Sequence, residues 1–362
     1  MKKIKWAALV LVAAMVVSLM ASAFTVYAEE EAPGEVTVLD AANSTLLADV
    51  IDKSYEPGIK MIGATVANLA EPWVEGFLTS LGKQYEEYGV KVQALSCDAN
   101  SVTQIEQVEN FITMGVDQII IIPFEPGVLF ESCDKAIAAG IDVIWITNVT
   151  DDVKQHISAG MAADAYQYGV EIAKLALSWV DEKYGKDAPE GSVHCGTLTN
   201  IGIEYIANRT AGILDTLAAD PRIALTYDND GCMFTDDSIA ATEDMLTVDP
   251  DIRLIVCWSD THGIPADSVL KSKNVDLSEY CIIAGCTSDS TCASIDASAN
   301  NESAFRGTIV EGKLDFGEDL FAVSYGLATG QIEKPYYSLH ELSYYTTIKE
   351  IDPSYKNWYE AE

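Results

Sequence analysis

Short apolar runs alternate with amphipathic segments along most of the chain. Four runs in its first half are rich in β-branched residues, and in the segments between them apolar residues repeat every three or four positions. Continuous apolar runs are typical of strands buried on both faces of a parallel sheet, whereas the three-to-four spacing predicts helices. Gly89, Gly115 and Gly140 each precede a run, at the place where a helix ends. The predicted strands are 59–67, 90–96, 117–122 and 141–147.

The same pattern starts again farther along the chain. Alternating strands and helices predict an α/β fold, and two consecutive sets predict two three-layer α/β/α lobes with parallel sheets. Ligands of such sheets bind at the carboxyl ends of the strands, so we expect the ligand site in the cleft between the lobes. The second set consists of strands at 192–198, 222–227, 253–258, 281–286 and 306–310, with helices at 164–184, 204–219, 236–247, 262–272, 288–299 and 316–329.

Amides, hydroxyls, carboxylates and aromatic rings recur where these strands end. Carboxylates and amides bind the hydroxyls of polyhydroxylated ligands, and aromatic faces cover their C–H surfaces. Each residue alone has a structural explanation: Asp260, for example, is also a suitable helix cap. Their coincidence at both sets of strand ends favours ligand binding. The candidate ligand-binding residues are Glu71, Trp73, Thr147, Asn148, Phe234, Trp258, Ser259, Asp260, Thr287 and Glu311.

The N-terminal residues 1–28 have the features of a secretory signal peptide. Three lysines precede an apolar stretch at 6–24, and Val26-Tyr27-Ala28 resembles a cleavage site. An uncleaved membrane anchor is the alternative. No cysteine precedes Cys97, so no lipoprotein cleavage site is evident. We therefore expect export to the periplasm or the cell exterior, with an acidic leader at 29–58 that includes a short helix.

The charge and the cysteine content narrow the function further. Acidic residues outnumber basic residues 56 to 22, for a net charge of −34, which disfavours binding to nucleic acid. The eight cysteines are scattered without a C-x-x-C motif, so we expect mostly free, buried thiols, with one or two disulfides possible within 232–292. No nucleophile, zinc-protease or P-loop motif is present. We therefore expect no catalytic residue, no metal site and no cofactor.

Five segments of the chain resemble a known family. They are IGATVANLAEPWVEGFLTSLGKQYEEYGVKV, VENFITMGVDQIIIIPFEPG, AAGIDVIWITN, IVCWSDTHGIPA and GTIVEG. Residues 59–340 thereby resemble the type-1 periplasmic binding proteins, in the ribose/galactose branch of the sugar-binding components of ABC transporters. The resemblance implies a monomer without enzymatic activity that captures a small polar ligand, foremost a sugar or sugar derivative, by lobe closure. It would then deliver this ligand to a membrane ABC permease.

The resemblance also implies how the chain is divided between the lobes. The chain would cross between them three times, near 158–162, 310–313 and 336–341. Lobe one would contain residues 59–160 and 312–337, and lobe two residues 161–311 and 338–362.

Several positions depart from the family pattern. Thr147 and Asn148 stand where the sugar binders have Asp, often followed by Arg, and Thr287 stands where an Asp is expected. The position of a common ligand-binding arginine is Ala207, with Arg209 two residues later. These departures put plain ribose or galactose in doubt as the ligand.

Other ligand classes and roles are compatible with the same fold. Glu71, Asp260 and Glu311, together with the nearby aromatic residues, would suit a cationic or amine-bearing ligand. A nucleoside ligand and a role as a ligand sensor also remain open. The orientation of Arg209 and Arg306 separates these possibilities, because two arginines that point away from the cleft would favour a cation.

Overall fold

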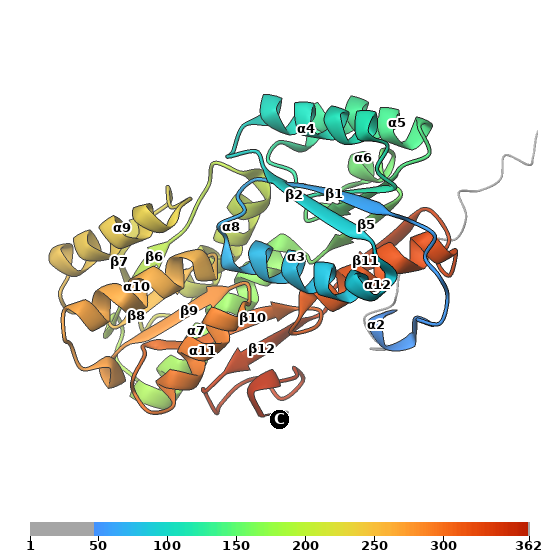
Figure 1. Ribbon diagram of the computed structural model, residues 1–362. Helices are drawn as coiled ribbons and strands as arrows, with labels where there is room; N and C mark the ends of the chain where they lie inside the picture. Colours follow the sequence, from blue (N-terminus) through green and yellow to red (C-terminus); the bar gives the residue numbers. More distant parts are fainter. Residues whose placement is uncertain (1–46, 361–362) are drawn as a thin grey trace, which may run out of the picture. The chain divides into compact units, whose positions relative to one another are not determined.

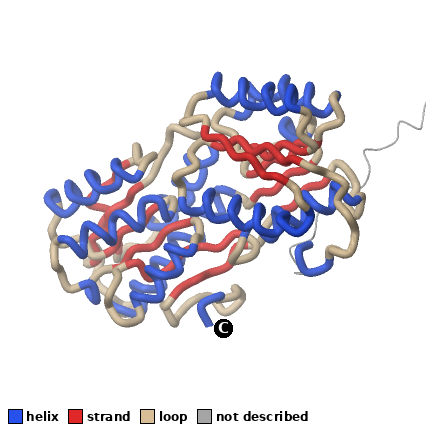
Figure 2. Tube along the Cα trace, in the orientation of Figure 1, coloured by secondary structure: helices blue, strands red, loops and turns tan. Residues whose placement is uncertain are grey.

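The computed structural model describes residues 47–360, which form two six-stranded sheets, each covered by helices on both faces. Figure 2 shows the strands as two groups flanked by helices. The expected signal peptide at 1–28 and the leader residues up to 46 lie outside the described residues. Within residues 47–360, no helix combines the length and apolar character needed to cross a membrane.

The sheet of lobe one is entirely parallel, with the strand order β11-β5-β4-β3-β1-β2. Its side chains alternate between two cores: Ile144 and Ile146 pack with α3 and α12, whereas Val143 and Trp145 pack with α4 and α5. This alternation follows from the two-residue period of a strand. The strands are β1 (Met61–Val66), β2 (Lys91–Ser96), β3 (Gln118–Ile121), β4 (Asp142–Ile146), β5 (Ala159–Ala162) and β11 (Tyr336–Leu339), and the helices are α3 (Pro72–Tyr85), α4 (Ser101–Met114), α5 (Phe130–Ala138), α6 (Asp151–Lys154) and α12 (Phe316–Thr329).

The sheet of lobe two has the order β12-β10-β9-β8-β6-β7 and is parallel except for β12, which pairs antiparallel with β10. Helices α7 and α8 cover one face, and α9, α10 and α11 cover the other. The strands are β6 (Val193–Leu198), β7 (Ile223–Asn229), β8 (Leu254–Cys257), β9 (Cys281–Gly285), β10 (Phe305–Glu311) and β12 (Leu342–Thr346), and the helices are α7 (Ala165–Tyr184), α8 (Glu204–Ala218), α9 (Thr235–Val248), α10 (Asp260–Ser272) and α11 (Asp289–Ser298).

Three connections join the lobes, at residues 163–164, 312–315 and 340–341, and backbone hydrogen bonds tie them together. The Gly312 amide donates to the Glu341 carbonyl oxygen at 2.9 Å, and the His340 amide donates to the Ala162 carbonyl oxygen at 2.8 Å. The connections therefore lie side by side and form a compact hinge. The short helix α2 (Leu47–Val50), within the expected leader, packs on α12, and Asp49 forms an ion pair of 2.6 Å with Lys313.

All eight cysteines are free thiols, six of them buried. The region 232–292 therefore contains none of the disulfides that the sequence left possible. Burial raises the pKa of these thiols; that of Cys133, for example, rises to about 12. The thiols thus pack as small apolar side chains.

Helices α7 and α8 pack with their backbones in contact because each carries a glycine at the crossing. A Cβ atom added at Gly169 would lie 1.9 Å from the Arg209 carbonyl oxygen, and one added at Gly212 would lie 2.1 Å from the Tyr166 carbonyl oxygen. No side chain fits at these distances, so the two helices approach this closely only with glycine at both positions.

We expect Gly212→Ala to destabilise the protein by about 2–3 kcal/mol, because the methyl group forces two helix backbones apart. The free energy of unfolding is measured by urea denaturation. Gly76→Ala in α3 is the control, since nothing lies within 4 Å of a Cβ atom added there. The control should gain about 0.5–1 kcal/mol from the higher helix propensity of alanine. A Gly212→Ala protein as stable as wild type would contradict the close packing.

Candidate functional site

A cavity of about 700 Å³, part of it open to solvent, lies between the strand ends of the two sheets. Residues of both lobes line it, and Glu311 at the second connection completes the lining. This inter-lobe cavity lies where open parallel sheets bind ligands. Its polar and aromatic lining residues are Asn68, Glu71, Trp73, Thr147, Tyr168, Tyr205, Arg209, Trp258, Cys286 and Glu311.

Arg209, on α8, is a buried cation in the cavity wall, with only 2% of its surface exposed. Its guanidinium carbon lies 3.9 Å from the centre of the Tyr168 ring and 4.9 Å from that of Tyr205. Nη1 donates to the Trp258 carbonyl oxygen at 3.1 Å, and Nη2 donates to the Tyr205 hydroxyl at 2.6 Å. Nε has no hydrogen-bond partner among residues 47–360. An unpartnered buried donor is costly, so Nε lacks an acceptor that it needs.

Two tryptophans contribute to the cavity, one from each lobe. Trp258 directly follows β8, and its indole Nε1 donates to the Cys232 carbonyl oxygen at 3.1 Å. Trp73 lies in the first turn of α3, and its ring centre is 4.9 Å from that of Phe77 and 5.1 Å from that of Phe316. Both indoles are thereby held in place by neighbours, and both present part of their surface to the cavity.

Two carboxyl groups, those of Glu71 and Glu311, line the cavity. The pKa of Glu71 is raised to about 8, mainly by burial; the charge of Asp260 adds to this rise, and Arg209 opposes it. Glu71 is therefore mostly protonated at neutral pH and can donate a hydrogen bond. Glu311 is buried, and its Oε1 lies 3.4 Å from Nδ1 of His340.

The backbone is strained where two strands reach the cavity. Thr147 after β4 has a φ of 71°, and Cys286 after β9 has a φ of 65°. Positive φ is uncommon for residues with a side chain and tends to cluster at functional sites. The turn at Cys286 is held by Tyr168, whose hydroxyl accepts a hydrogen bond from the Cys286 amide and donates one to the Ile309 carbonyl oxygen, both at 2.9 Å.

Five of the ten predicted ligand-binding residues line the cavity and five do not. Those that line it are Glu71, Trp73, Thr147, Trp258 and Glu311. Phe234 is not part of the lining and is 43% exposed. Asn148, the residue after Thr147, is not part of the lining either. Thr287 donates to the Ile309 carbonyl oxygen at 3.4 Å.

Ser259 and Asp260 belong to a buried hydrogen-bond network outside the cavity lining. The Ser259 hydroxyl caps α10 and also donates to Asp260 at 3.2 Å. Asp260 further accepts from Ser288 at 3.0 Å and from Thr291 at 2.6 Å. Burial raises the pKa of Asp260, and these hydroxyls oppose the rise. Asp260 thus joins α10 to α11 and acts on the cavity through its charge.

The residues that the sequence did not single out come mainly from helices. Tyr168 lies in the first turn of α7, and Tyr205 and Arg209 lie one turn apart on α8. The candidate residues were chosen at strand ends, and these residues are not at strand ends. The family resemblance came close to one of them: it places an arginine at position 207, and Arg209 lies two residues later.

Nothing in the described part of the chain gathers three potential metal ligands into one cluster. His262, beside Trp258, is buried, and burial lowers the pKa of His262 to about 3. Its ring is therefore neutral, and Nδ1 lies 2.5 Å from the Ser238 hydroxyl.

The sequence is similar to that of a known binding protein. The chain is 22% identical over 216 residues to the ribose import binding protein RbsB of Bacillus subtilis (strain 168), an alignment that covers 60% of this chain and 67% of that protein.

The fold is shared with solved structures. A carbohydrate transporter solute binding protein from Agrobacterium radiobacter, in complex with D-arabinose, has a TM-score of 0.64 at 20% identity, over 82% of this chain and 97% of that one. A periplasmic solute binding protein from Actinobacillus succinogenes 130z with bound D-allose has a TM-score of 0.65 at 16% identity, over 79% and 97%. The family model described as "Periplasmic binding protein domain" matches residues 62–332. The chain therefore belongs to the periplasmic binding protein family.

Proposed function

We propose that this protein is the sugar-binding component of an ABC transporter and that it captures a neutral monosaccharide or a close derivative in the inter-lobe cavity. The observation that carries the proposal is Arg209, whose buried Nε lacks a partner and which lines the same cavity as two indoles. A sugar hydroxyl or ring oxygen satisfies this donor while the apolar side of the ring covers an indole. One related protein is named for ribose import, and two similar structures contain D-arabinose and D-allose. These sugars support the same ligand class.

The charges of the cavity favour a neutral ligand over a cation. Glu71 is mostly protonated at neutral pH, since its pKa is about 8. The charge of Arg209 then faces that of Glu311, so the lining carries no excess of negative charge. Arg306 points elsewhere: its guanidinium donates to the Leu277 and Tyr280 carbonyl oxygens, both at 2.9 Å. Arg306 is thus turned away from the cleft, whereas Arg209 lines it. Since only two arginines pointing away would favour a cation, the amine-bearing ligand is not favoured.

We propose lobe closure as the mechanism of capture. Trp73, Glu71 and Thr147 belong to lobe one, whereas Arg209 and Trp258 belong to lobe two. A ligand that contacts both sets binds the closed state more tightly than the open state and shifts the population toward closure. Asn148, Phe234, Ser259, Asp260 and Thr287 remain predicted contacts of the ligand-bound state. The ligand leaves chemically unchanged, and the closed monomer, exported from the cytoplasm, presents it to a membrane permease.

A thermal-shift panel tests the ligand class directly. We expect one of D-ribose, D-arabinose, D-allose, D-xylose, D-fucose or myo-inositol to raise the melting temperature, since a ligand at 100 times its Kd stabilises by about 2.7 kcal/mol. Nucleosides and polyamines serve as negative controls. Arg209→Lys should weaken binding of that sugar by at least about tenfold, because lysine lacks the planar donor fork.

Arg306→Lys is the matched control for this panel, since Arg306 is also held by carbonyl oxygens but lies outside the cavity. Its sugar affinity should equal that of wild type. A panel in which only a polyamine or a nucleoside stabilises the protein would contradict the proposed ligand class.

Trp73→Ala should weaken sugar binding by at least about 1 kcal/mol, the magnitude of an aromatic contact. Isothermal titration of the folded fraction measures the affinity. Phe77→Leu is the control, because Phe77 belongs to the same aromatic cluster but is buried outside the cavity lining. We expect that control to lose stability and retain affinity. If folded Trp73→Ala protein binds like wild type, Trp73 is a core residue only.

A further inference from the structure

The imidazole of His340 is buried at the hinge, where the second and third connections meet. Its side chain is 3% exposed and that of Glu311 is 5% exposed. Nδ1 of His340 and Oε1 of Glu311 lie 3.4 Å apart, and neither atom has a hydrogen-bond partner in the described part of the chain. A buried polar atom without a partner is costly, so these two facing atoms are each other's only available compensation.

The groups around this pair are mostly acidic. Asp319, in the first turn of α12, also faces His340, and burial raises the pKa of its carboxyl group. Lys313 is occupied by Asp49 at 2.6 Å and by Glu318 at 3.0 Å. The remaining neighbour on α12 is the Phe316 ring, whose centre lies 5.3 Å from that of His340. On the cavity side, the charge of Glu311 acts on Arg209 and on the hydroxyls of Tyr168 and Tyr205.

The ring of His340 therefore sits between two carboxyl groups. Burial lowers the pKa of His340, but Glu311 and Asp319 together outweigh burial, so the pKa lies above 6.5. The two carboxyl groups thus favour the imidazolium form of His340, against the effect of burial. By linkage, the pair stabilises the fold below pH 6.5, and this contribution is lost as the pH rises through the raised pKa.

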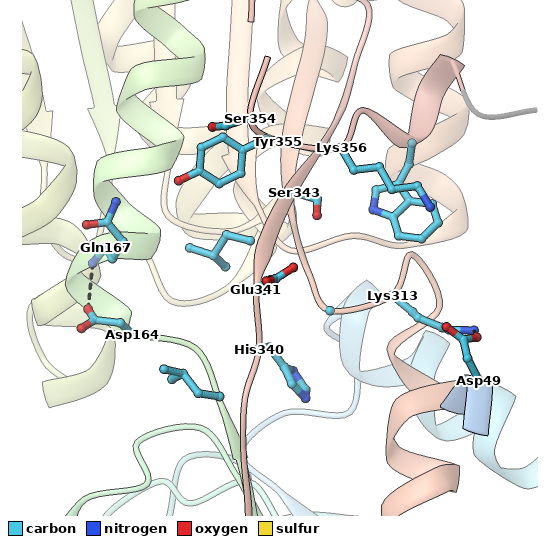
Figure 3. A pocket seen from close by; sticks show the side chains of 14 residues that line it. Asp49, Asp164, Gln167, Lys313, His340, Glu341, Ser343, Ser354, Tyr355 and Lys356 are labelled. Atoms are coloured by element: carbon cyan, nitrogen blue, oxygen red, sulfur yellow. Dashed lines mark hydrogen bonds and ion pairs between the residues drawn. The ribbon is translucent and has the colours of Figure 1, made fainter. Parts of the chain in front are cut away.

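Glu311 and His340 connect two separate spaces. Glu311 lines the inter-lobe cavity, whereas His340 lines a hinge pocket of about 1710 Å³ that is partly open to solvent. Figure 3 shows His340 at this hinge pocket together with Glu341, Lys313 and Asp49. The hinge pocket gives the ring access to solvent protons that does not pass through the inter-lobe cavity.

We propose, on the basis of the proposed sugar-binding function, that His340 is a positioning residue. Its imidazolium holds the Glu311 carboxylate at the cavity and joins the second connection to the third. Sugar affinity therefore depends on the protonation of His340. When His340 is charged, Glu311 is fixed and accepts hydrogen bonds from the ligand. When His340 is neutral, Glu311 loses its counter-charge on the hinge side, and both its orientation and the hinge become less defined.

The ion pair itself is tested without a ligand. Histidine side-chain NMR of the wild-type protein, with His340 assigned by comparison with His340→Gln, gives its pKa. We expect a value above 6.5 that falls in Glu311→Gln, because that variant removes the counter-charge. A His340 pKa below 6.5, or one that Glu311→Gln leaves unchanged, would overturn the proposal.

The effect on function is tested with the sugar that stabilises wild type most in the thermal-shift panel. At pH 6, His340→Gln should bind this sugar about tenfold more weakly than wild type, which corresponds to about 1.4 kcal/mol. At a pH where NMR shows His340 to be neutral, the two affinities should converge. Glu71 titrates in both proteins, so its effect on affinity divides out in the ratio of the two affinities.

His156→Gln is the matched control, since His156 also pairs with a carboxylate, Asp134 at 2.8 Å, but lies outside both pockets. It should bind like wild type at both pH values. A ratio for His340→Gln that is the same at both pH values would overturn the positioning role. If no sugar binds wild type, the proposed function fails and the effect on affinity fails with it, whereas the NMR result still decides whether the ion pair exists.

Discussion

A charge that folding removes from water must be compensated, and the guanidinium of Arg209 imposes this constraint on the whole cavity. Its compensation comes from π faces, from a carbonyl oxygen of lobe two and from the carboxylate of Glu311 beyond them. The side chain can occupy this place because α7 and α8 touch through Gly169 and Gly212. That contact brings Arg209 on α8 over the Tyr168 ring on α7. The packing of lobe two thus determines the position of the main polar group of the site.

The hinge carries the second set of constraints. Glu311 ends β10 and belongs to the cavity, and the next residue, Gly312, is hydrogen-bonded to the third connection. His340 lies on that third connection, with its Nδ1 3.4 Å from Oε1 of Glu311, and it is next to Asp319 of lobe one. Glu311 thus links the cavity lining to the second and third connections through an adjacent residue and a direct contact.

The sequence predicted most of the fold, because a buried parallel strand requires a continuous apolar run. The nine predicted strands are present with small shifts of their ends, as are helices such as α7 and α12. Three strands escaped prediction. In β5 the sequence is AGMA, without β-branched residues, and β11 and β12 are short strands at the edges of their sheets, rich in tyrosine and serine.

The site was predictable where it depends on strand ends and not where it depends on helix crossing. Trp258 and Glu311 directly follow or end a strand, and both line the cavity. Tyr205 and Arg209 reach it because α8 crosses α7 closely, and such a tertiary contact leaves no local pattern in the sequence. Phe234 follows the same strand-end logic as Trp258, but it is 43% exposed at the start of α9. Local patterns identify which edge of a sheet holds the site, whereas packing selects the side chains.

The central claim is that a neutral sugar contacts both lobes at once and draws them together. Small-angle X-ray scattering of the protein with and without its stabilising sugar tests this most directly, with saturation verified by calorimetry on the same sample. The account predicts a smaller radius of gyration in the bound state, and a smaller decrease for Arg209→Lys at the same sugar concentration. A radius of gyration that stays the same at verified saturation would contradict closure as the mechanism of capture.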